Sequence, residues 1–123
     1  MRLLNRDRKA INGAKVLVLG VAYKQDIDDY RESPAIRVID ELQKVGAEVR
    51  YFDPYIPAYQ EGGKMVRGEM ELSVESLRNA DLVMITCAHT NINYNFVQQN
   101  ARRIFDTKNA MKNVECRENI EVL

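Results

Sequence analysis

Short apolar runs alternate along this chain with segments of helical period. Residues 15–21 are almost continuously apolar, which is typical of a parallel strand buried on both faces. Ser33-Pro34 is a good helix start, and apolar residues recur at helical spacing from there to Gly46, a residue type that commonly ends helices. A second strand is predicted over residues 47–52. The first half therefore predicts a β-α-β unit, for which a right-handed crossover is the strong default.

The second half repeats the alternation after an interruption. Between Pro54 and Gly68 the period is lost, which indicates a loop or a short irregular helix, with a short strand near residues 64–67. The pattern then predicts helices over 74–79 and 91–103 and strands over 82–87, 104–106 and 120–123. This alternation predicts the α/β class: a Rossmann-like, open, mostly parallel sheet with helices on both faces, in three layers (α/β/α).

Composition suits one folded domain. The chain has 123 residues, 46% hydrophobic and 29% charged, with a net charge of zero. The chain therefore has no net positive charge to attract nucleic acid or a membrane surface, and any anion site must come from a local group of basic residues. Two cysteines cannot form a disulfide framework, and reduced thiols suit the cytoplasm. With no apolar signal core and no apolar run near the roughly 20 residues of a membrane span, we expect a soluble, cytoplasmic protein.

The loop after the first predicted strand concentrates charged side chains. It carries Lys24, three aspartates and Arg31. In open α/β sheets, ligands bind beyond the carboxyl ends of the strands, where this loop is expected. The G-x-G-x-x-G fingerprint of dinucleotide sites is missing, because Gly20 is followed by Val21-Ala22-Tyr23-Lys24, and residues bulkier than glycine block a close backbone approach to pyrophosphate. A lysine in this place predicts a different anion partner, since Lys binds phosphate as a point charge.

The charged residues of this loop also have structural interpretations. Lys24 either contacts the phosphate or sugar of a nucleotide-sugar or is a solvated loop lysine. Arg31 either pairs with a phosphate through two hydrogen bonds or forms a salt bridge with Asp28 or Asp29, and the two roles can coexist. We expect Asp28, Asp29 and Glu32 to orient the two bases rather than to perform acid–base chemistry. Neither they nor the chain's one histidine and two cysteines predict a metal site, and no residue is assigned a catalytic role.

Polar residues also follow the later strands. Lys108 comes after a predicted strand and should lie at the same edge of the sheet, with Asn109 beside it. His89 also follows a strand, a place typical of site residues, but no Ser or Cys partner for a catalytic triad is evident. Cys87 ends an apolar run and is interpreted as a core residue.

Several segments, in order, are similar to a known family. They resemble the C-terminal, UDP-binding domain of the UDP-glucose/GDP-mannose dehydrogenase family from about residue 15 onward. Two segments of the chain, Asp26-Ile27-Asp28-Asp29 and Glu32-Ser33-Pro34-Ala35, look closer to the UDP-N-acetylhexosamine 6-dehydrogenases than to the UDP-glucose enzymes. The segments that carry the resemblance are Gly20-Val21-Ala22-Tyr23-Lys24, Asp28-Asp29-Tyr30-Arg31-Glu32-Ser33-Pro34-Ala35, Tyr51-Phe52-Asp53-Pro54, Ala80-Asp81-Leu82-Val83 and Phe105-Asp106-Thr107-Lys108-Asn109.

The resemblance implies roles for individual residues. In that family an aromatic residue and a lysine, here Tyr23 and Lys24, line the UDP-sugar site. Many relatives carry, at the position of Lys108, an arginine that contacts the UDP-sugar; Lys108 keeps the charge but loses the bidentate fork. The arginine at Arg31 reaches NAD bound by the preceding domain. The substrate-binding residues are thus expected to be Tyr23, Lys24 and Lys108, and Arg31 is expected to be cofactor-binding.

The resemblance also implies a larger enzyme. Residues 1–14 would be the end of an interdomain helix or linker, and residues 15–123 the UDP-sugar-binding domain. The full enzyme would use NAD to oxidise a UDP-hexose or UDP-N-acetylhexosamine to its uronic acid through a catalytic cysteine, for polysaccharide biosynthesis. That cysteine and the NAD fingerprint would belong to the N-terminal and central domains. The isolated chain is therefore expected to be inactive, and the full-length protein to form a homo-oligomer.

Stand-alone modules are the competing interpretation. A receiver-like signalling domain is also doubly wound and has a lysine after a late strand, a place that Lys108 fits. It requires an acidic pair after the first strand and an acceptor aspartate ending the third. Ala22-Tyr23 occupy the first place, and no clear third-strand aspartate is found. A structural dimerisation domain, in which Lys24 and Arg31 only form ion pairs, is a further alternative.

Overall fold

A five-stranded parallel sheet organises the molecule, and its strands come from the apolar runs of the sequence. The computed structural model describes residues 12–31 and 33–122. The strand order is β2-β1-β5-β6-β7, and each neighbouring pair is parallel. This confirms the predicted Rossmann-like sheet. The strands are β1 (Lys15–Leu19), β2 (Glu48–Phe52), β5 (Leu82–Ile85), β6 (Ile104–Asp106) and β7 (Ile120–Val122).

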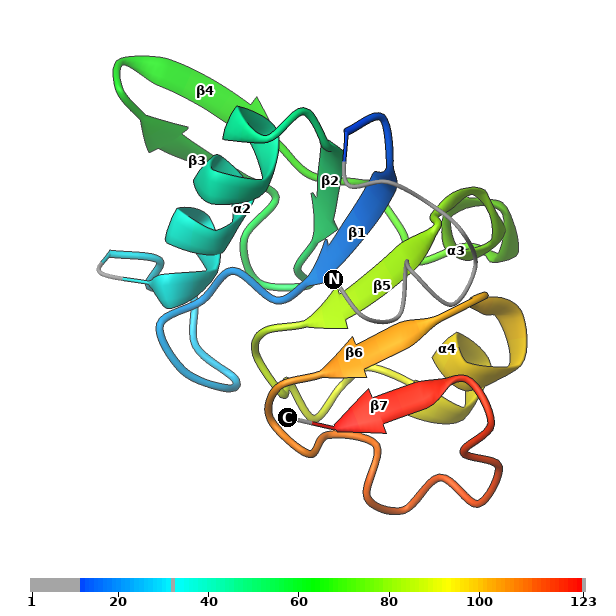
Figure 1. The fold of residues 1–123 in the computed structure, drawn as a ribbon. Coiled ribbons are helices and arrows are strands. Elements are labelled where there is room, and N and C mark those ends of the chain that lie inside the picture. The colour runs from blue at the N-terminus through cyan, green and yellow to red at the C-terminus, as the bar shows by residue number, and fades with distance from the viewer. Residues whose placement is uncertain (1–11, 32, 123) are drawn as a thin grey trace.

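Helices cover both faces of this sheet, which gives the three layers visible in Figure 1. Helix α2 (Pro34–Lys44) packs on one face, and α3 (Val74–Asn79) and α4 (Tyr94–Asn100) pack on the other. Ser33 caps α2 as predicted, because its hydroxyl accepts a hydrogen bond from the Ala35 amide at 3.2 Å.

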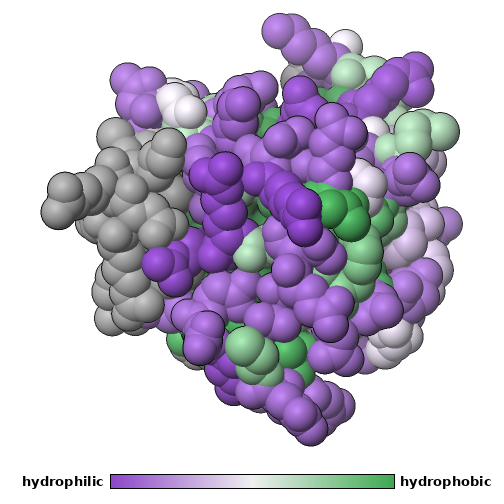
Figure 2. Space-filling model, turned by 90° about the vertical axis from the view of Figure 1, so that its right-hand side faces the viewer, coloured by the Kyte–Doolittle hydropathy of each residue, from purple (hydrophilic) through white to green (hydrophobic). Residues whose placement is uncertain are grey.

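The strand side chains alternate between two hydrophobic clusters. On β1, Val16 and Val18 pack in the cluster that includes the buried face of α2. Leu17 and Leu19 pack in the cluster that includes the buried residues of α3 and α4. Both faces of β1 are therefore buried, which explains its near-continuous apolar sequence. The outer surface on the side that carries α3 and α4 is mostly hydrophilic (Figure 2).

The segment between β2 and α3 differs from the prediction. The short strand at residues 64–67 is confirmed as β4 (Lys64–Arg67), but it pairs with β3 (Ala58–Glu61), which was predicted as loop or irregular helix. The hairpin turns at Gly62 and Gly63, whose φ angles of 57° and 78° are typical of a two-residue hairpin loop.

Several predicted boundaries were too wide. The predicted helix 91–103 is shorter, because Asn93 caps α4 by accepting a hydrogen bond from the Phe96 amide at 3.1 Å and Ala101 is extended. The predicted strands 15–21 and 82–87 each end two residues earlier. The prediction for residues 1–14 falls largely outside the described residues. Among the described residues, no helix has both the length and the apolar character that crossing a membrane would require.

Candidate functional site at the carboxyl edge of the sheet

The strand order creates a location beside β1 where ligands commonly bind in this type of sheet. The chain runs from β1 through α2 to β2 on one side, and β5 then pairs on the other side of β1. In open α/β sheets the crevice at such a reversal lies beyond the carboxyl ends of the strands. Figure 1 shows that the loops after β1, β5 and β6 emerge at this edge. These loops carry Lys24, His89 and Lys108, as the sequence predicts.

Gly20 lets the first loop leave the sheet close to β5. Its φ of 92° is left-handed, and a Cβ placed there would lie 2.5 Å from the Cβ of Cys87. Cys87 is itself buried, as expected for a core residue.

The loop that carries Lys24 is anchored at its base and open at its tip. The Val21 amide donates to Oδ2 of Asp53 at 2.8 Å, and the Tyr23 amide donates to the carbonyl of Asp29 at 2.7 Å. The side chains at the tip face solvent: Tyr23 is 55% exposed, and Lys24 is also exposed. The backbone thus presents an aromatic ring and a cation from a fixed position.

A buried polar network supports this loop from below. His89 is completely buried, and its Nε2 lies 2.8 Å from Oδ2 of Asp53. On the other side of the ring, the Asp26 amide donates to Nδ1 at 2.8 Å. Burial opposes ionisation of Asp53, but hydrogen bonds from His89 and from the Tyr55 and Val21 amides outweigh it and hold the pKa of that carboxyl below its usual value. Sequence reasoning missed this network.

Asp26 joins the first loop to the loop after β5. Its carboxylate accepts hydrogen bonds from the Thr90 amide at 2.8 Å and the Thr90 hydroxyl at 2.9 Å. The backbone hydrogen bond from Thr90 is the main reason that the pKa of Asp26 lies below its usual value. Asp26 also has a φ of 62°, an uncommon conformation for a residue with a side chain. Its role is therefore structural, and the described residues contain no group of ligands that fits a metal ion.

Lys108 stands on a turn that a second buried carboxylate holds. Asp106, at the end of β6, accepts hydrogen bonds from the Lys108 and Ala110 amides, each at 3.0 Å, and from the Met111 amide at 2.8 Å. Asp106 is completely buried, whereas Lys108 and Asn109 are exposed. The lysine therefore rises from a turn fixed by three backbone hydrogen bonds.

One strand, β5, separates the two lysine-bearing loops. Neighbouring strands are about 4.8 Å apart, so the ends of β1 and β6 are separated by about 10 Å. The loops that carry Lys24 and Lys108 therefore leave the sheet from the two strands that flank β5.

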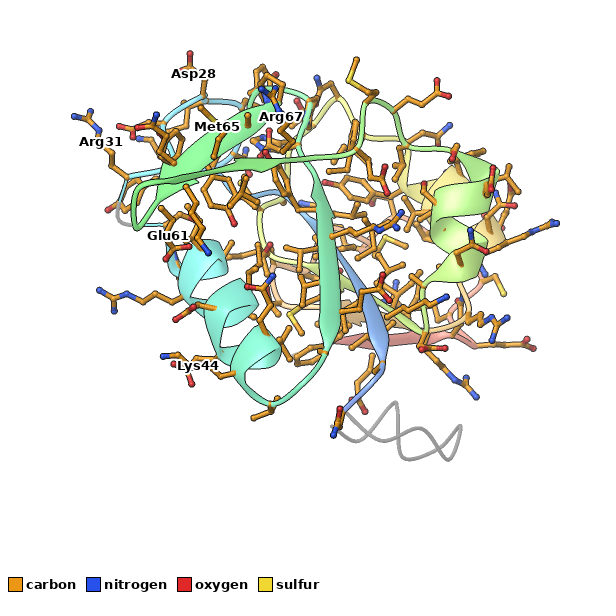
Figure 3. All side chains as sticks on the ribbon, turned by 90° about the horizontal axis from the view of Figure 1, so that it is seen from above. Asp28, Arg31, Lys44, Glu61, Met65 and Arg67 are labelled. Atoms are coloured by element: carbon orange, nitrogen blue, oxygen red, sulfur yellow. The ribbon has the colours of Figure 1, made fainter. Side chains whose placement is uncertain are left out.

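Arg31 forms the ion pair that was one of its two predicted interpretations. Its Nη2 lies 3.0 Å from Oδ2 of Asp29, and its Nε lies 3.1 Å from Oδ1. These contacts to Arg31 hold the pKa of Asp29 below its usual value. The Arg31 side chain is 84% exposed and points away from the body of the molecule in Figure 3. Because the side chain is this exposed, the guanidinium faces solvent while it pairs with Asp29.

The edge does not fit the pyrophosphate of a dinucleotide in the usual manner. With Gly20 as its first glycine, the fingerprint requires a second glycine at position 22, where the chain has Ala22, buried just after β1. NAD is therefore not expected to bind this edge through a glycine-rich loop.

Comparison with known proteins agrees with this geometry. A model of the UDP-glucose/GDP-mannose dehydrogenase family, UDP binding domain, matches residues 17–113. A UDP-N-acetyl-D-mannosamine dehydrogenase from Pyrococcus horikoshii is 31% identical over 104 residues, which is 80% of this chain and 22% of the relative. A UDP-glucose 6-dehydrogenase from Rhizobium meliloti is 50% identical over 44 residues, 36% of this chain and 10% of that relative.

Solved structures give the same result. An NDP-N-acetyl-D-galactosaminuronic acid dehydrogenase from Methanosarcina mazei superposes with a TM-score of 0.76 and 27% identity, over 99% of this chain and 26% of that one. This chain therefore spans about a quarter or less of the length of these relatives. None of these findings supports a receiver-like module. The chain belongs to the UDP-glucose/GDP-mannose dehydrogenase family and corresponds to its UDP binding domain.

Proposed function

We propose that this domain binds the UDP part of a UDP-sugar at the carboxyl edge of its sheet. Lys24 and Lys108 contact the diphosphate or the sugar, and Tyr23 packs against the ligand. The observation that carries this proposal is the pair of exposed lysines on loops anchored by the buried carboxylates of Asp53 and Asp106. Two flexible cations on fixed loops are well suited to a diphosphate, which lacks a single rigid geometry.

The proposal extends to the whole enzyme of which this domain forms part. With N-terminal and central domains, it would oxidise a UDP-hexose or UDP-N-acetylhexosamine to the uronic acid with NAD, in the cytoplasm and as a homo-oligomer. Arg31 would leave its exposed pair with Asp29 and contact NAD held by the preceding domain. The 123-residue chain alone would bind the nucleotide without turnover. The named relatives, which are UDP-sugar dehydrogenases, support this extension.

A titration of the ¹⁵N-labelled chain with UDP tests the location of the site. We expect weak binding, with a Kd on the order of 0.1–1 mM, because only part of a complete site is present. The amide signals that move should be those of the loops 20–26 and 106–110. Shifts confined to the β3–β4 hairpin or to α3 would contradict the assignment. Uridine, which lacks the diphosphate, is the matched control and should bind at least tenfold more weakly.

Turnover is a separate measurement. The chain alone, supplied with UDP-glucose or UDP-N-acetylmannosamine and NAD, should produce no NADH. NADH formation by the isolated chain would contradict the assignment of the chemistry to other domains.

A further inference from the structure

His89 lies where four parts of the chain meet beneath the proposed site. Asp53 contacts it from the end of β2, and Asp26 from the loop after β1. The ring of Tyr55 lies 4.9 Å away between ring centroids. The Tyr94 hydroxyl of α4 donates to the His89 carbonyl at 2.7 Å. A histidine that is completely buried, with both ring nitrogens in hydrogen bonds, is held in one orientation.

The two hydrogen bonds define the protonation state of the ring. The Asp26 amide is a donor, so Nδ1 must accept and carries no hydrogen. Nε2 faces a carboxylate oxygen of Asp53, which is an acceptor, so Nε2 carries the hydrogen. The geometry therefore requires the neutral tautomer with the hydrogen on Nε2. An imidazolium would direct a second hydrogen from Nδ1 at the Asp26 amide hydrogen.

The same contacts hold both ends of the segment that presents Lys24. Asp53 accepts from the Val21 amide at one end, and His89 accepts from the Asp26 amide at the other. Tyr23 and Lys24 lie between these two anchor points in the sequence. Both anchors lead to Oδ2 of Asp53: the Val21 amide contacts this oxygen directly, and the Asp26 amide is connected to it through the His89 ring. Loss of the His89 contact would remove the bond of the Asp26 backbone to the buried network, while the Asp26 carboxylate would keep its hydrogen bonds from Thr90.

We propose that His89 is a positioning residue for the UDP site: its neutral ring holds the loop that presents Tyr23 and Lys24, and protonation of the ring releases that loop. This inference rests on the proposed function, because it assigns a role to His89 in the binding of UDP by that loop.

The groups that face the ring favour opposite charge states. Burial disfavours the charged form of His89, but hydrogen bonding and charge from Asp53, with a contribution from Cys87, outweigh it and raise its pKa above the usual value. Asp26 acts in both directions: its Oδ1 lies 3.9 Å from Nδ1 and favours the charged ring, whereas its amide hydrogen points at Nδ1 and opposes a proton there. The ring thus lies between two carboxylates, which favour protonation, and a backbone amide, which requires its absence.

Nuclear magnetic resonance of the ring tests the tautomer directly. His89 is the chain's one histidine, so its ring nitrogens are assigned without ambiguity. At a pH above the ring's titration we expect the pattern of the neutral tautomer with the hydrogen on Nε2. The opposite tautomer, with the hydrogen on Nδ1, would overturn the proposal.

The functional test compares UDP affinity in the wild type and His89→Gln from about pH 6 to about pH 10. Gln also offers a donor group, its NH₂, and an acceptor, its carbonyl oxygen, but does not titrate. As the pH falls through the ring's titration, wild-type affinity should fall about tenfold more than that of His89→Gln, in step with the ring signal. Titration of UDP itself is common to both proteins and cancels in this comparison. Coinciding profiles would overturn the positioning role.

A second variant and a second observable separate this inference from the proposed function. His89→Phe keeps an aromatic ring without hydrogen bonds, and it should bind UDP about tenfold more weakly than wild type at the high end of the pH range, where the wild-type ring is neutral. Hydrogen exchange of the Asp26 amide, measured without UDP, should be faster in His89→Phe than in wild type. If UDP binds neither the wild type nor either variant at any pH, the proposed function is wrong. If UDP binds but His89→Phe matches wild type, only the role of His89 fails.

Discussion

Replacing Asp106 by asparagine should destabilise the domain by removing one of three backbone hydrogen bonds. The carboxylate receives the Lys108 and Ala110 amides on Oδ1 and the Met111 amide on Oδ2. An asparagine has one acceptor oxygen, so its best orientation keeps the first two bonds and turns its NH₂ group toward the Met111 amide. That amide would then be a buried donor without a partner, because Met111 and the side chain at 106 are both completely buried.

The expected cost follows from these contacts. A hydrogen bond to a charged group contributes about 1.5–3 kcal/mol, and an unsatisfied buried donor costs about 1–3 kcal/mol. Because the substitution also removes the cost of burying a carboxylate, we expect a net loss of about 2–4 kcal/mol in the free energy of unfolding. The turn that carries Lys108 should loosen in the same variant.

Urea denaturation followed by far-ultraviolet circular dichroism measures this loss, since the chain has no tryptophan. With a slope of about 2 kcal/mol per molar urea, a loss of about 3 kcal/mol lowers the midpoint by about 1.5 M. Asp28→Asn is the matched control, because Asp28 is exposed and its substitution should change stability by less than about 0.5 kcal/mol. Equal midpoints for Asp106→Asn and Asp28→Asn would refute the role given to Asp106.

Two further predictions concern the first loop and its support. Gly20→Ala should lower the free energy of unfolding by about 3 kcal/mol, because φ is 92° and the new Cβ would lie 2.5 Å from the Cβ of Cys87. Gly62→Ala is the control: Gly62 also has a positive φ, but no atom lies within 4 Å of the new Cβ, so this variant should lose only about 1 kcal/mol. Similar losses in urea denaturation would show that steric contact with Cys87 is unimportant. Asp53 contributes stability that is fully present above the unfolded pKa of about 3.9 and lost as the pH falls through its lower folded pKa. Asp53→Asn should therefore be less stable at neutral pH and lose less stability than wild type between about pH 5 and about pH 2; parallel curves would argue against this linkage.

The sequence predicted the elements whose patterns are local. The apolar run of β1, the cap at Ser33 and the stripe of α2 are each set within a few neighbouring residues, and all are confirmed. The paired Gly62 and Gly63 between two short runs were a signal for the β3–β4 hairpin. The prolines at 54 and 57 obscured it, because they indicate a loop.

The network beneath the site was beyond this kind of reasoning. Asp53 and His89 are 36 residues apart, and Asp26 and His89 are 63 apart. Only the strand order, with β1 between β2 and β5, brings these loops together. Sequence reasoning placed His89 correctly past a strand end but searched for a nucleophile as its partner, whereas its partners are a carboxylate and a backbone amide. The positions of Lys24 and Lys108 followed from one rule, that the loops after parallel strands lie at the carboxyl edge of the sheet. The structure confirms that both lysines are on such loops.

A comparison of UDP affinity between Lys24→Ala and Lys44→Ala tests whether the UDP site is built on Lys24. Both variants remove one exposed lysine, but Lys44 lies in the last turn of α2, beside Asp40 and Glu41, at the opposite end of that helix from the Lys24 loop (Figure 3). Loss of a charge-assisted contact of about 1.5–3 kcal/mol predicts that Lys24→Ala binds UDP at least tenfold more weakly in calorimetry, whereas Lys44→Ala matches wild type. Equal affinity in all three proteins would contradict a UDP site built on Lys24.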